Sequence, residues 1–198
     1  KEAIAKDSVV PYFQPIINLA GIKKYETLMR IVTPDRVITP YFFLEIAKKT
    51  GDYNTLTKIM IEKSFKRFQF SEAHFSINLS YQDATNPSLV EFLTDQIEKY
   101  GVADRLILEI VESESIDNFS TILNFLAQFR EMGVRIAIDD FGSGYSNFSY
   151  LLQLNPEYIK IDGSIIRNID TDEKSYLIAK TIAGFAQSLG IKTIAEFI

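Results

Sequence analysis

The chain has 198 residues, 46% of them hydrophobic, and a net charge of −5, which suits one globular domain over residues 1–198 with a substantial core. The absence of cysteine excludes disulfides, thiolate metal sites and a cysteine nucleophile, and the single histidine, His74, excludes a histidine-rich metal site. The acidic balance argues against binding of a nucleic-acid polymer through a basic face.

Two extended segments open the chain. Residues 9–18 and 22–31 are predicted strands, and the tight turn at 19–21 that joins them predicts an antiparallel hairpin. Two helices are predicted next, over residues 40–50 and 54–69, the second with apolar residues in near-helical register.

Strands and helices then alternate regularly. Strands are predicted at 74–79, 106–111, 134–139, 158–161 and 192–196, and helices at 88–100, 120–132, 146–154 and 172–189. Ser120 is the expected N-cap of its helix. Helices between strands mean crossover connections and parallel strands, so the expected fold class is α/β. No linker or internal repeat is visible.

Polar or ionisable residues stand at or near the carboxyl end of each of these strands. They are Asn78, Glu109, Glu112, Asp139, Asp140, Lys160, Asp162 and Glu196, and the second strand carries Glu26 and Arg30. In a parallel barrel these ends converge on one face, where barrel enzymes keep their active sites. Any single residue could be a helix cap or a turn residue, but the number of acids favours one shared site.

The stretch 136–148, IAIDDFGSGYSNF, is the most informative. Two carboxylates, Asp139 and Asp140, end a short apolar run, and carboxylates in that position are costly unless a positive group meets them. No lysine or arginine occurs in the next ten residues, so a hard divalent cation is a natural partner. The alternative is that the two acids merely begin a turn before Gly142.

Oxygen donors from several strands suit Mg²⁺ or Mn²⁺. Glu26, Asn78, Glu109 and Asp139 would offer ligands to one ion, and Asp140 could reach a second. Two such ions can clamp the attacking and leaving oxygens of a phosphoryl displacement. The pattern therefore predicts a metal-dependent reaction on a phosphate ester.

Three further residues have two interpretations each. Lys160 could orient the attacking water or neutralise charge in the transition state, or it could form a structural salt bridge to a neighbouring acid. Arg30 lies on the same strand face as Glu26 and could grip a phosphate bidentately, or it could form a surface ion pair. Glu196 could accept a proton or complete a metal shell, or it could be a solvated strand end.

These motifs resemble those of one family, the EAL domain, the cyclic di-GMP phosphodiesterase module of bacterial signalling proteins. The motifs are YFQPI (12–16), YETLMR (25–30), INLS (77–80), LEIVES (108–113), DDFGSGYSN (139–147), YIKID (158–162) and IAE (194–196). Their occurrence in the family's order over the whole chain makes the resemblance specific.

The resemblance implies a modified (β/α)8 TIM-type barrel whose first strand runs antiparallel, with the family's carboxyl-terminal strand and helix missing from this chain. It implies hydrolysis of cyclic di-GMP to the linear dinucleotide pGpG with two Mg²⁺ or Mn²⁺ ions. By motif, the metal ligands are Glu26, Asn78, Glu109, Asp139 and Asp140, the catalytic residues are Lys160, Glu196 and Glu112, and the substrate-binding residues are Gln14, Leu28, Arg30 and Asp162. A homodimer and fused sensory or cyclase domains are the implied partners.

Departures from the family pattern keep a second function open. Thr27 stands where the family usually has alanine, Phe197 stands where it has glycine, and the family motif continues beyond Ile198. The alternative is a catalytically inactive EAL-like domain that serves as a cyclic di-GMP receptor or a protein-interaction module. An unrelated barrel lyase with a Schiff base on Lys160 would not need so many converging acids.

The expected location follows from two absences. No apolar run reaches the roughly 18–20 residues that span a bilayer, and the amino terminus, KEAIAKDSVV, lacks the apolar centre of a signal peptide. The domain is therefore expected to be cytoplasmic and without membrane contact of its own, within a parent protein that could be membrane-anchored.

Overall fold

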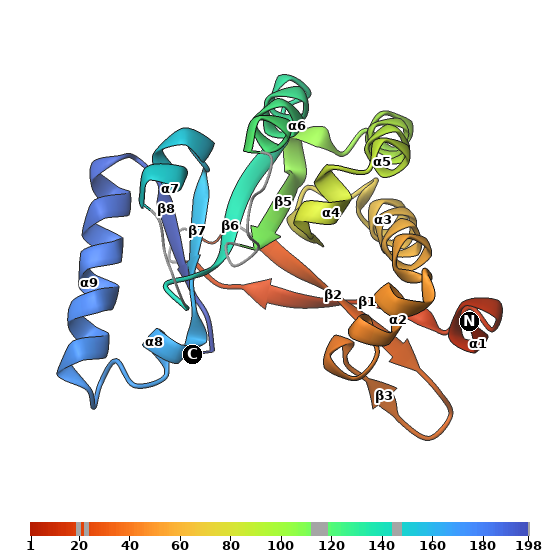
Figure 1. The fold of residues 1–198 in the computed structure, drawn as a ribbon, viewed down its shortest axis with the longest axis horizontal. Coiled ribbons are helices and arrows are strands. Elements are labelled where there is room, and N and C mark those ends of the chain that lie inside the picture. Colours follow the sequence, from red (N-terminus) through yellow and green to blue (C-terminus); the bar gives the residue numbers. More distant parts are fainter. Residues whose placement is uncertain (19–20, 22–23, 112–118, 144–147, 198) are drawn as a thin grey trace. The chain divides into compact units, whose positions relative to one another are not determined.

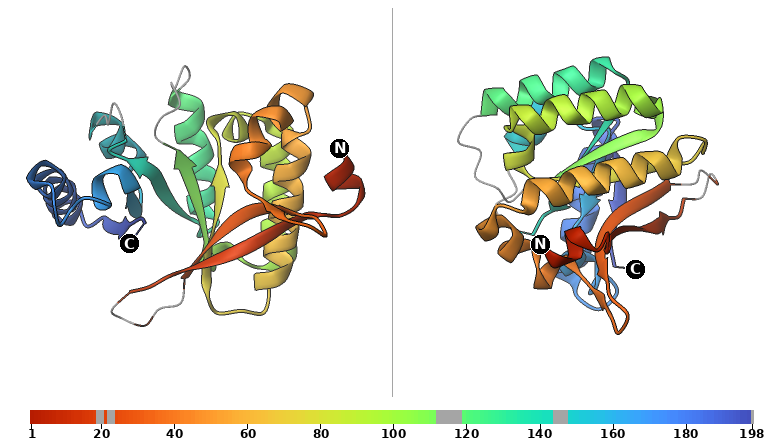
Figure 2. Two further views of the ribbon diagram at one scale, coloured as in Figure 1. Left: turned by 90° about the horizontal axis from the view of Figure 1, so that it is seen from below. Right: turned by 90° about the vertical axis from the view of Figure 1, so that its right-hand side faces the viewer.

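The computed structural model describes residues 1–18, 21, 24–111, 119–143 and 148–197. They form a mixed α/β fold in which helices connect parallel strands (Figures 1 and 2). Two compact units are distinguished: Lys1–Asn78 with Gln82–Ile107, and Leu79–Tyr81 with Leu108–Ile198. Among the described residues, no helix is both long and apolar enough to cross a membrane.

Strands and helices follow one another closely along the chain (Figure 1). In chain order they are α1 (Glu2–Ala5), β1 (Val9–Ile16), β2 (Lys24–Val32), β3 (Val37–Ile38), the 3-10 helix η1 (Pro40–Phe42), α2 (Leu44–Thr50), α3 (Tyr53–Phe68), β4 (His74–Leu79), α4 (Tyr81–Ala84), α5 (Pro87–Tyr100), η2 (Ala103–Arg105), β5 (Leu106–Val111), α6 (Phe119–Glu131), β6 (Arg135–Phe141), α7 (Phe148–Leu154), β7 (Tyr158–Ile161), α8 (Gly163–Ile166), α9 (Glu173–Ser188) and β8 (Lys192–Ala195).

Strand pairing confirms the opening hairpin and the parallel strands that follow it. In the first unit β1 and β3 each pair antiparallel with β2, and β2 pairs parallel with β4. In the second unit β6 pairs parallel with β7, and β7 with β8. The carboxyl ends of β6, β7 and β8 therefore lie at the same edge of their sheet, as the sequence predicted.

The hairpin of the first unit packs one face against α3. The Phe13 ring meets the Phe68 ring edge-on, with centroids 5.1 Å apart, and Phe68 stacks on Phe75 of β4 at 4.3 Å. Val9 lies in a buried cluster with Leu56 and Met60 of α3. Because side chains alternate across a strand, the residues between these leave the opposite face of the hairpin for other functions.

In the second unit, β6 and β7 form the buried centre. Ile136, Ala137 and Ile159 are fully buried, and α6 contributes Leu126 and Phe129 to the core. Strands buried on both faces read as continuous apolar runs in an α/β fold. A charged residue within such a strand therefore needs specific partners.

Most helix boundaries agree with the sequence prediction. Gly51 and Gly101 end α2 and α5 in the left-handed conformation, and the Asp172 carboxylate accepts hydrogen bonds from the amides of Lys174 and Ser175 at the start of α9. The predicted N-cap at Ser120 is wrong, because the helix already includes Phe119 and Ser120 is its second residue.

Some expectations fall on parts of the chain outside the described residues. These are the turn residues 19–20, the expected catalytic residue Glu112, the glycine-loop residues 144–147 and Ile198. For them the sequence predictions stand as predictions.

Candidate active site

A β-bulge places the two consecutive acids of β6. Ile138 pairs with Ile159 and Phe141 with Ile161, so β6 carries one residue more than β7 between these two pairs. Asp140 occupies the left-handed region, with a φ of +54°. In a regular strand Asp139 and Asp140 would point to opposite faces, whereas a bulge re-aims one of them.

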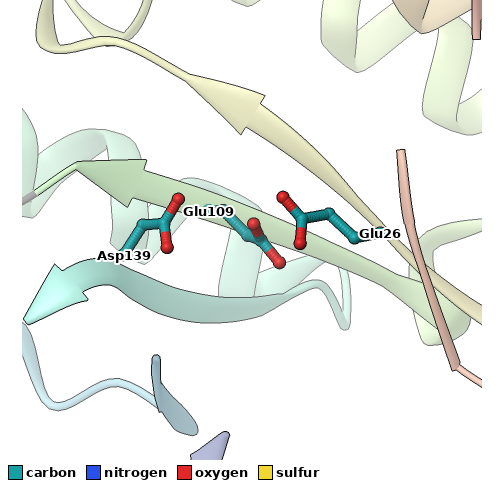
Figure 3. A group of neighbouring side chains, drawn as sticks. All are labelled: Glu26, Glu109 and Asp139. Atoms are coloured by element: carbon teal, nitrogen blue, oxygen red, sulfur yellow. The ribbon is translucent and has the colours of Figure 1, made fainter. Parts of the chain in front are cut away.

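Lys160 of β7 is the centre of an ion cluster. Its ammonium lies 2.8 Å from a carboxylate oxygen of Asp139, 2.9 Å from one of Glu109 and 2.9 Å from one of Glu196. The side chains of Lys160 and Glu109 are each only 1% exposed. Figure 3 shows the Glu109 and Asp139 carboxylates side by side on β5 and β6. We call Glu109, Asp139, Lys160 and Glu196 the Lys160 cluster.

The Lys160 cluster has more acid than base, since one ammonium faces three carboxylates. Asp140 adds a further acid, because oxygens of Asp139, Asp140 and Glu196 all lie within 4.8 Å of one another. Ligand oxygens on opposite sides of one Mg²⁺ are about 4 Å apart, so small side-chain rotations suffice for these three to share an ion. The donor set fits a hard divalent cation.

Asp140 has a strongly shifted pKa. Burial is the largest cause, and the Asp139 and Asp162 carboxylates add to it, so that the pKa of Asp140 is raised to about 6, although Lys160 acts in the opposite direction. Repulsion between neighbouring carboxylates at a strand end is relieved when a cation binds between them.

Asp162 is a helix cap, one of the alternatives that the sequence left open for the polar residues at the strand ends. Its carboxylate accepts a hydrogen bond of 2.8 Å from the amide of Ser164 and thereby caps α8, and it is also hydrogen-bonded to Asp140. Burial alone would raise the pKa of Asp162, but the hydrogen bonds from Ser164 and Gly163 outweigh it, and the pKa is lowered. Asp162 is thus tied to the second acid of the bulge.

In the first unit, three expected substrate-binding residues and one expected metal ligand lie in one row along the β1–β2 hairpin. Gln14 pairs with Glu26, Tyr12 with Leu28, and Val10 with Arg30. Directly opposed residues of an antiparallel pair point to the same face, so Gln14, Glu26, Leu28 and Arg30 share the hairpin face that α3 does not cover. We call these four residues the hairpin row. Asn78 of β4 joins the row, because its side-chain amide donates to Glu26 at 3.3 Å.

Sequence reasoning missed Tyr12 as part of this row. Tyr12 is 45% exposed, it lies opposite Leu28, and the Arg30 guanidinium sits 5.9 Å from its ring centroid. The signal was present, because Tyr12 precedes Gln14 by one alternation of the strand and therefore faces the same side.

Comparison with known proteins gives concordant matches. The sequence profile of the EAL domain family matches residues 1–198. The chain is 32% identical to "Cyclic di-GMP phosphodiesterase PdeB" of Shewanella oneidensis over 207 residues, which covers 100% of this chain and 24% of that protein. It is 31% identical to "Cyclic di-GMP phosphodiesterase PdeF" of Escherichia coli, covering 93% of this chain and 26% of that protein. The chain thus spans about a quarter of the length of these relatives.

Among solved structures, the complex of the PaMucR phosphodiesterase with c-di-GMP superposes with a TM-score of 0.91 at 28% identity. That match covers 100% of this chain and 84% of the other. It confirms the α/β fold class and the modified barrel fold predicted from the sequence, with its antiparallel first strand.

Proposed function

This chain belongs to the EAL domain family, and on that premise we propose that it hydrolyses one phosphodiester bond of cyclic di-GMP to give linear pGpG. The observation that carries the proposal is the Lys160 cluster, in which a buried lysine stands among acids contributed by several strands. A protein that only bound the nucleotide would not need a buried ammonium beside oxygen donors suited to a metal.

We propose Mg²⁺ or Mn²⁺ as the cofactor, in two ions. Glu26, Asn78, Glu109 and Asp139 would hold one ion and Asp140 the other, as in the family motif. The oxygen-only donor set supports this choice, because hard cations prefer carboxylate and amide oxygens. Such ions, when bound, supply positive charge that polarises the phosphodiester and activates water.

Lys160 and Glu196 have distinct roles in the proposed reaction. The Lys160 ammonium has three N–H donors and three carboxylate partners, so it would donate to the attacking water once a bound cation takes over one of these carboxylates. Its positive charge also offsets charge in the transition state. Glu196 orients that ammonium through its 2.9 Å ion pair and accepts a proton. Glu112, which lies outside the described residues, is proposed to brace the glycine loop.

The hairpin row would bind the nucleotide. Arg30 can donate two parallel hydrogen bonds to a phosphate, and Leu28 offers apolar contact to a base. Gln14 can donate to and accept from the edge of a guanine. Asp162 is also proposed as a substrate-binding residue, although one of its oxygens caps α8.

We also propose three features of the parent protein. A homodimer, fused sensory or cyclase domains and a cytoplasmic location are expected for a signalling module of this family. The solved complex of the PaMucR phosphodiesterase with c-di-GMP supports the nucleotide as the ligand, and no polymeric nucleic acid is proposed as a partner.

The test is hydrolysis of cyclic di-GMP by the full-length protein with Mg²⁺ or Mn²⁺, with pGpG followed by chromatography. We expect product that a chelator abolishes, that Asp139→Asn and Glu26→Gln reduce by at least about 100-fold, and that Asp104→Asn, an exposed control, leaves unchanged. Full activity in either ligand variant would disprove the metal assignment.

A second variant separates turnover from binding. Lys160→Ala should lower turnover far more than nucleotide affinity, because Lys160 acts in the transition state. Equal losses in both would assign Lys160 to binding or structure. Tight binding of cyclic di-GMP by the unaltered protein with no product would establish the receptor function instead.

A further inference from the structure

Phe197 adopts a backbone conformation that favours glycine. Its φ is +55°, in the left-handed region that residues with a bulky side chain rarely occupy. The side chain is also 66% exposed, so burial in a core does not stabilise it. Some specific contact must offset the strain.

The contact is with Gly163 and Arg167. A Cβ added to Gly163 would overlap the Phe197 ring, lying 2.8 Å from Cε2 and 2.9 Å from Cγ, so the ring occupies the space that a larger residue at position 163 would need. The Arg167 guanidinium lies 4.1 Å from the ring centroid, within the range of a cation–π interaction. We call Gly163, Arg167 and Phe197 the Phe197 clamp.

The clamp joins the ends of two strands. Gly163 and Arg167 belong to α8 and its C-cap, which follow β7, and Phe197 follows β8. The paired register of these strands ends at Ile161 and Ala195, and the next amide, that of Glu196, donates to the Ile161 carbonyl at 3.4 Å. This distance is long for an N–H···O bond, so the strand ladder alone holds Glu196 weakly.

Glu196 makes that last ladder bond with its own amide, and the next residue in the chain is Phe197 of the clamp. Its carboxylate meets the Lys160 ammonium at 2.9 Å and lies within 4.8 Å of Asp139 and Asp140 oxygens. A shift of the β8 end would move this carboxylate out of the Lys160 cluster. Glycine at position 197 would relieve the φ strain but would leave the strand end less restrained.

We propose that Phe197 is a positioning residue: its ring, seated on Gly163 and beside Arg167, fixes the end of β8 so that the Glu196 carboxylate stays at the Lys160 ammonium. The consequence for turnover rests on the proposed phosphodiesterase function, whereas the positioning itself does not.

The test uses complementary variants of the full-length protein. Phe197→Gly removes the ring and the strain, Gly163→Ala places a Cβ where the ring lies, and the double variant Gly163→Ala/Phe197→Gly combines them. Matched controls are Phe70→Ala, because Phe70 is 94% exposed, and Gly184→Ala, because nothing lies within 4 Å of a Cβ there.

Hydrogen exchange of the Glu196 amide with chelator present needs neither metal nor substrate. Phe197→Gly and Gly163→Ala should each speed exchange about 10-fold, the double variant should exchange no faster than Phe197→Gly alone, and the controls should match the unaltered protein. Unchanged exchange in Phe197→Gly would overturn the clamp, as would additive effects in the double variant.

Kinetics then separate positioning from mere stabilisation. We expect kcat for cyclic di-GMP to fall about 10-fold in Phe197→Gly while KM changes less than about twofold, since a misplaced group near the reaction affects turnover most. Faster exchange with unchanged kcat would overturn the positioning role. If the unaltered protein shows no turnover, the proposed function fails, and Mn²⁺ affinity by calorimetry decides the clamp: a loss of about 10-fold in Phe197→Gly supports it and an unchanged affinity refutes it.

Discussion

Asp139 and Asp140 are consecutive residues of β6, yet oxygens of both carboxylates lie within 4.8 Å of one another and of Glu196. The bulge between Ile138 and Phe141 accounts for this. One extra residue in the strand and a left-handed Asp140 put two acids where a regular strand would present one.

The bulge predicts which substitutions Asp140 tolerates. Asn adopts positive φ readily, whereas a β-branched residue does not, so Asp140→Val should be less stable than Asp140→Asn by about 1–2 kcal/mol. Urea unfolding with chelator present measures the difference. Lys192→Val and Lys192→Asn, at an exposed position of β8, are the control pair for β-branching itself, because a β-branched residue is favoured over asparagine in an ordinary strand. Equal stability of the two Asp140 variants would mean that the left-handed conformation is not required.

The Lys160 cluster predicts a stability effect that metal reverses. Lys160→Met leaves the buried Glu109 carboxylate and its neighbours without their ammonium, and loss of one partner of a buried ion pair typically costs about 3–5 kcal/mol. Urea unfolding with chelator should show this loss, and Mn²⁺ should restore more stability to Lys160→Met than it adds to the unaltered protein.

The control for that experiment is Lys174→Met, an exposed lysine of α9, which should be unaffected with or without Mn²⁺. A loss in Lys160→Met that is the same with chelator and with Mn²⁺ would argue against a cation site at these carboxylates.

Gly142, directly after β6, predicts a steric effect. Its φ is +96°, and an added Cβ would overlap Ile165 Cδ1 and lie 3.3 Å from Ile182 Cδ1. Gly142→Ala should therefore destabilise the chain by about 1–3 kcal/mol. Gly184→Ala, in the helix α9 with free space around it, should be neutral or stabilising by up to about 1 kcal/mol. Thermal unfolding of the two variants compares them, and similar melting temperatures would refute the close packing of Gly142.

Helix α9 predicts a pH effect at its N-cap. The Asp172 carboxylate accepts hydrogen bonds from Ser175, and these hold the pKa of Asp172 below its usual range. A carboxyl whose pKa is lower in the folded chain contributes stability above its unfolded pKa, near 4, and that stability is lost as the pH falls through the folded pKa.

Asp172→Asn keeps a capping oxygen but cannot titrate. Its stability should therefore fall less than that of the unaltered chain between about pH 5 and pH 2, measured as the difference between the two urea-unfolding curves at each pH. Asp170→Asn, which removes another exposed acid near the start of α9, is the control and should follow the unaltered chain. Parallel curves for Asp172→Asn and the unaltered chain would show that the cap carries no titration-dependent stability.

The sequence predicted the strands well because each is a short apolar run with a polar residue at its end. His74–Leu79, Leu106–Val111 and Tyr158–Ile161 have the predicted bounds. The four-residue helices α1, α4 and α8 were missed, since so short a segment shows no periodicity. The helix expected at 40–50 is divided at Phe43 into η1 and α2.

The site was predicted in its residues but not in its geometry. Spacing cannot reveal the bulge, which depends on the register between β6 and β7. For Lys160 the catalytic and salt-bridge interpretations were both open, and the ion pair with Asp139 exists at 2.8 Å without excluding a catalytic role. Asp162 was assigned to the substrate, while its capping of α8 required knowledge of that short helix.

The hairpin row has a consequence for how this chain can change during evolution. Gln14, Glu26, Leu28 and Arg30 face one side only because β1 and β2 keep their register, and a slip of one residue turns every side chain of a strand over. A single inserted or deleted codon within 24–30 would therefore turn the row residues of β2 on one side of the change toward α3, and one within 12–16 could do the same to Gln14 of β1. Strand length in the hairpin should be invariant among functional descendants, whereas substitutions at individual positions can be accepted one at a time.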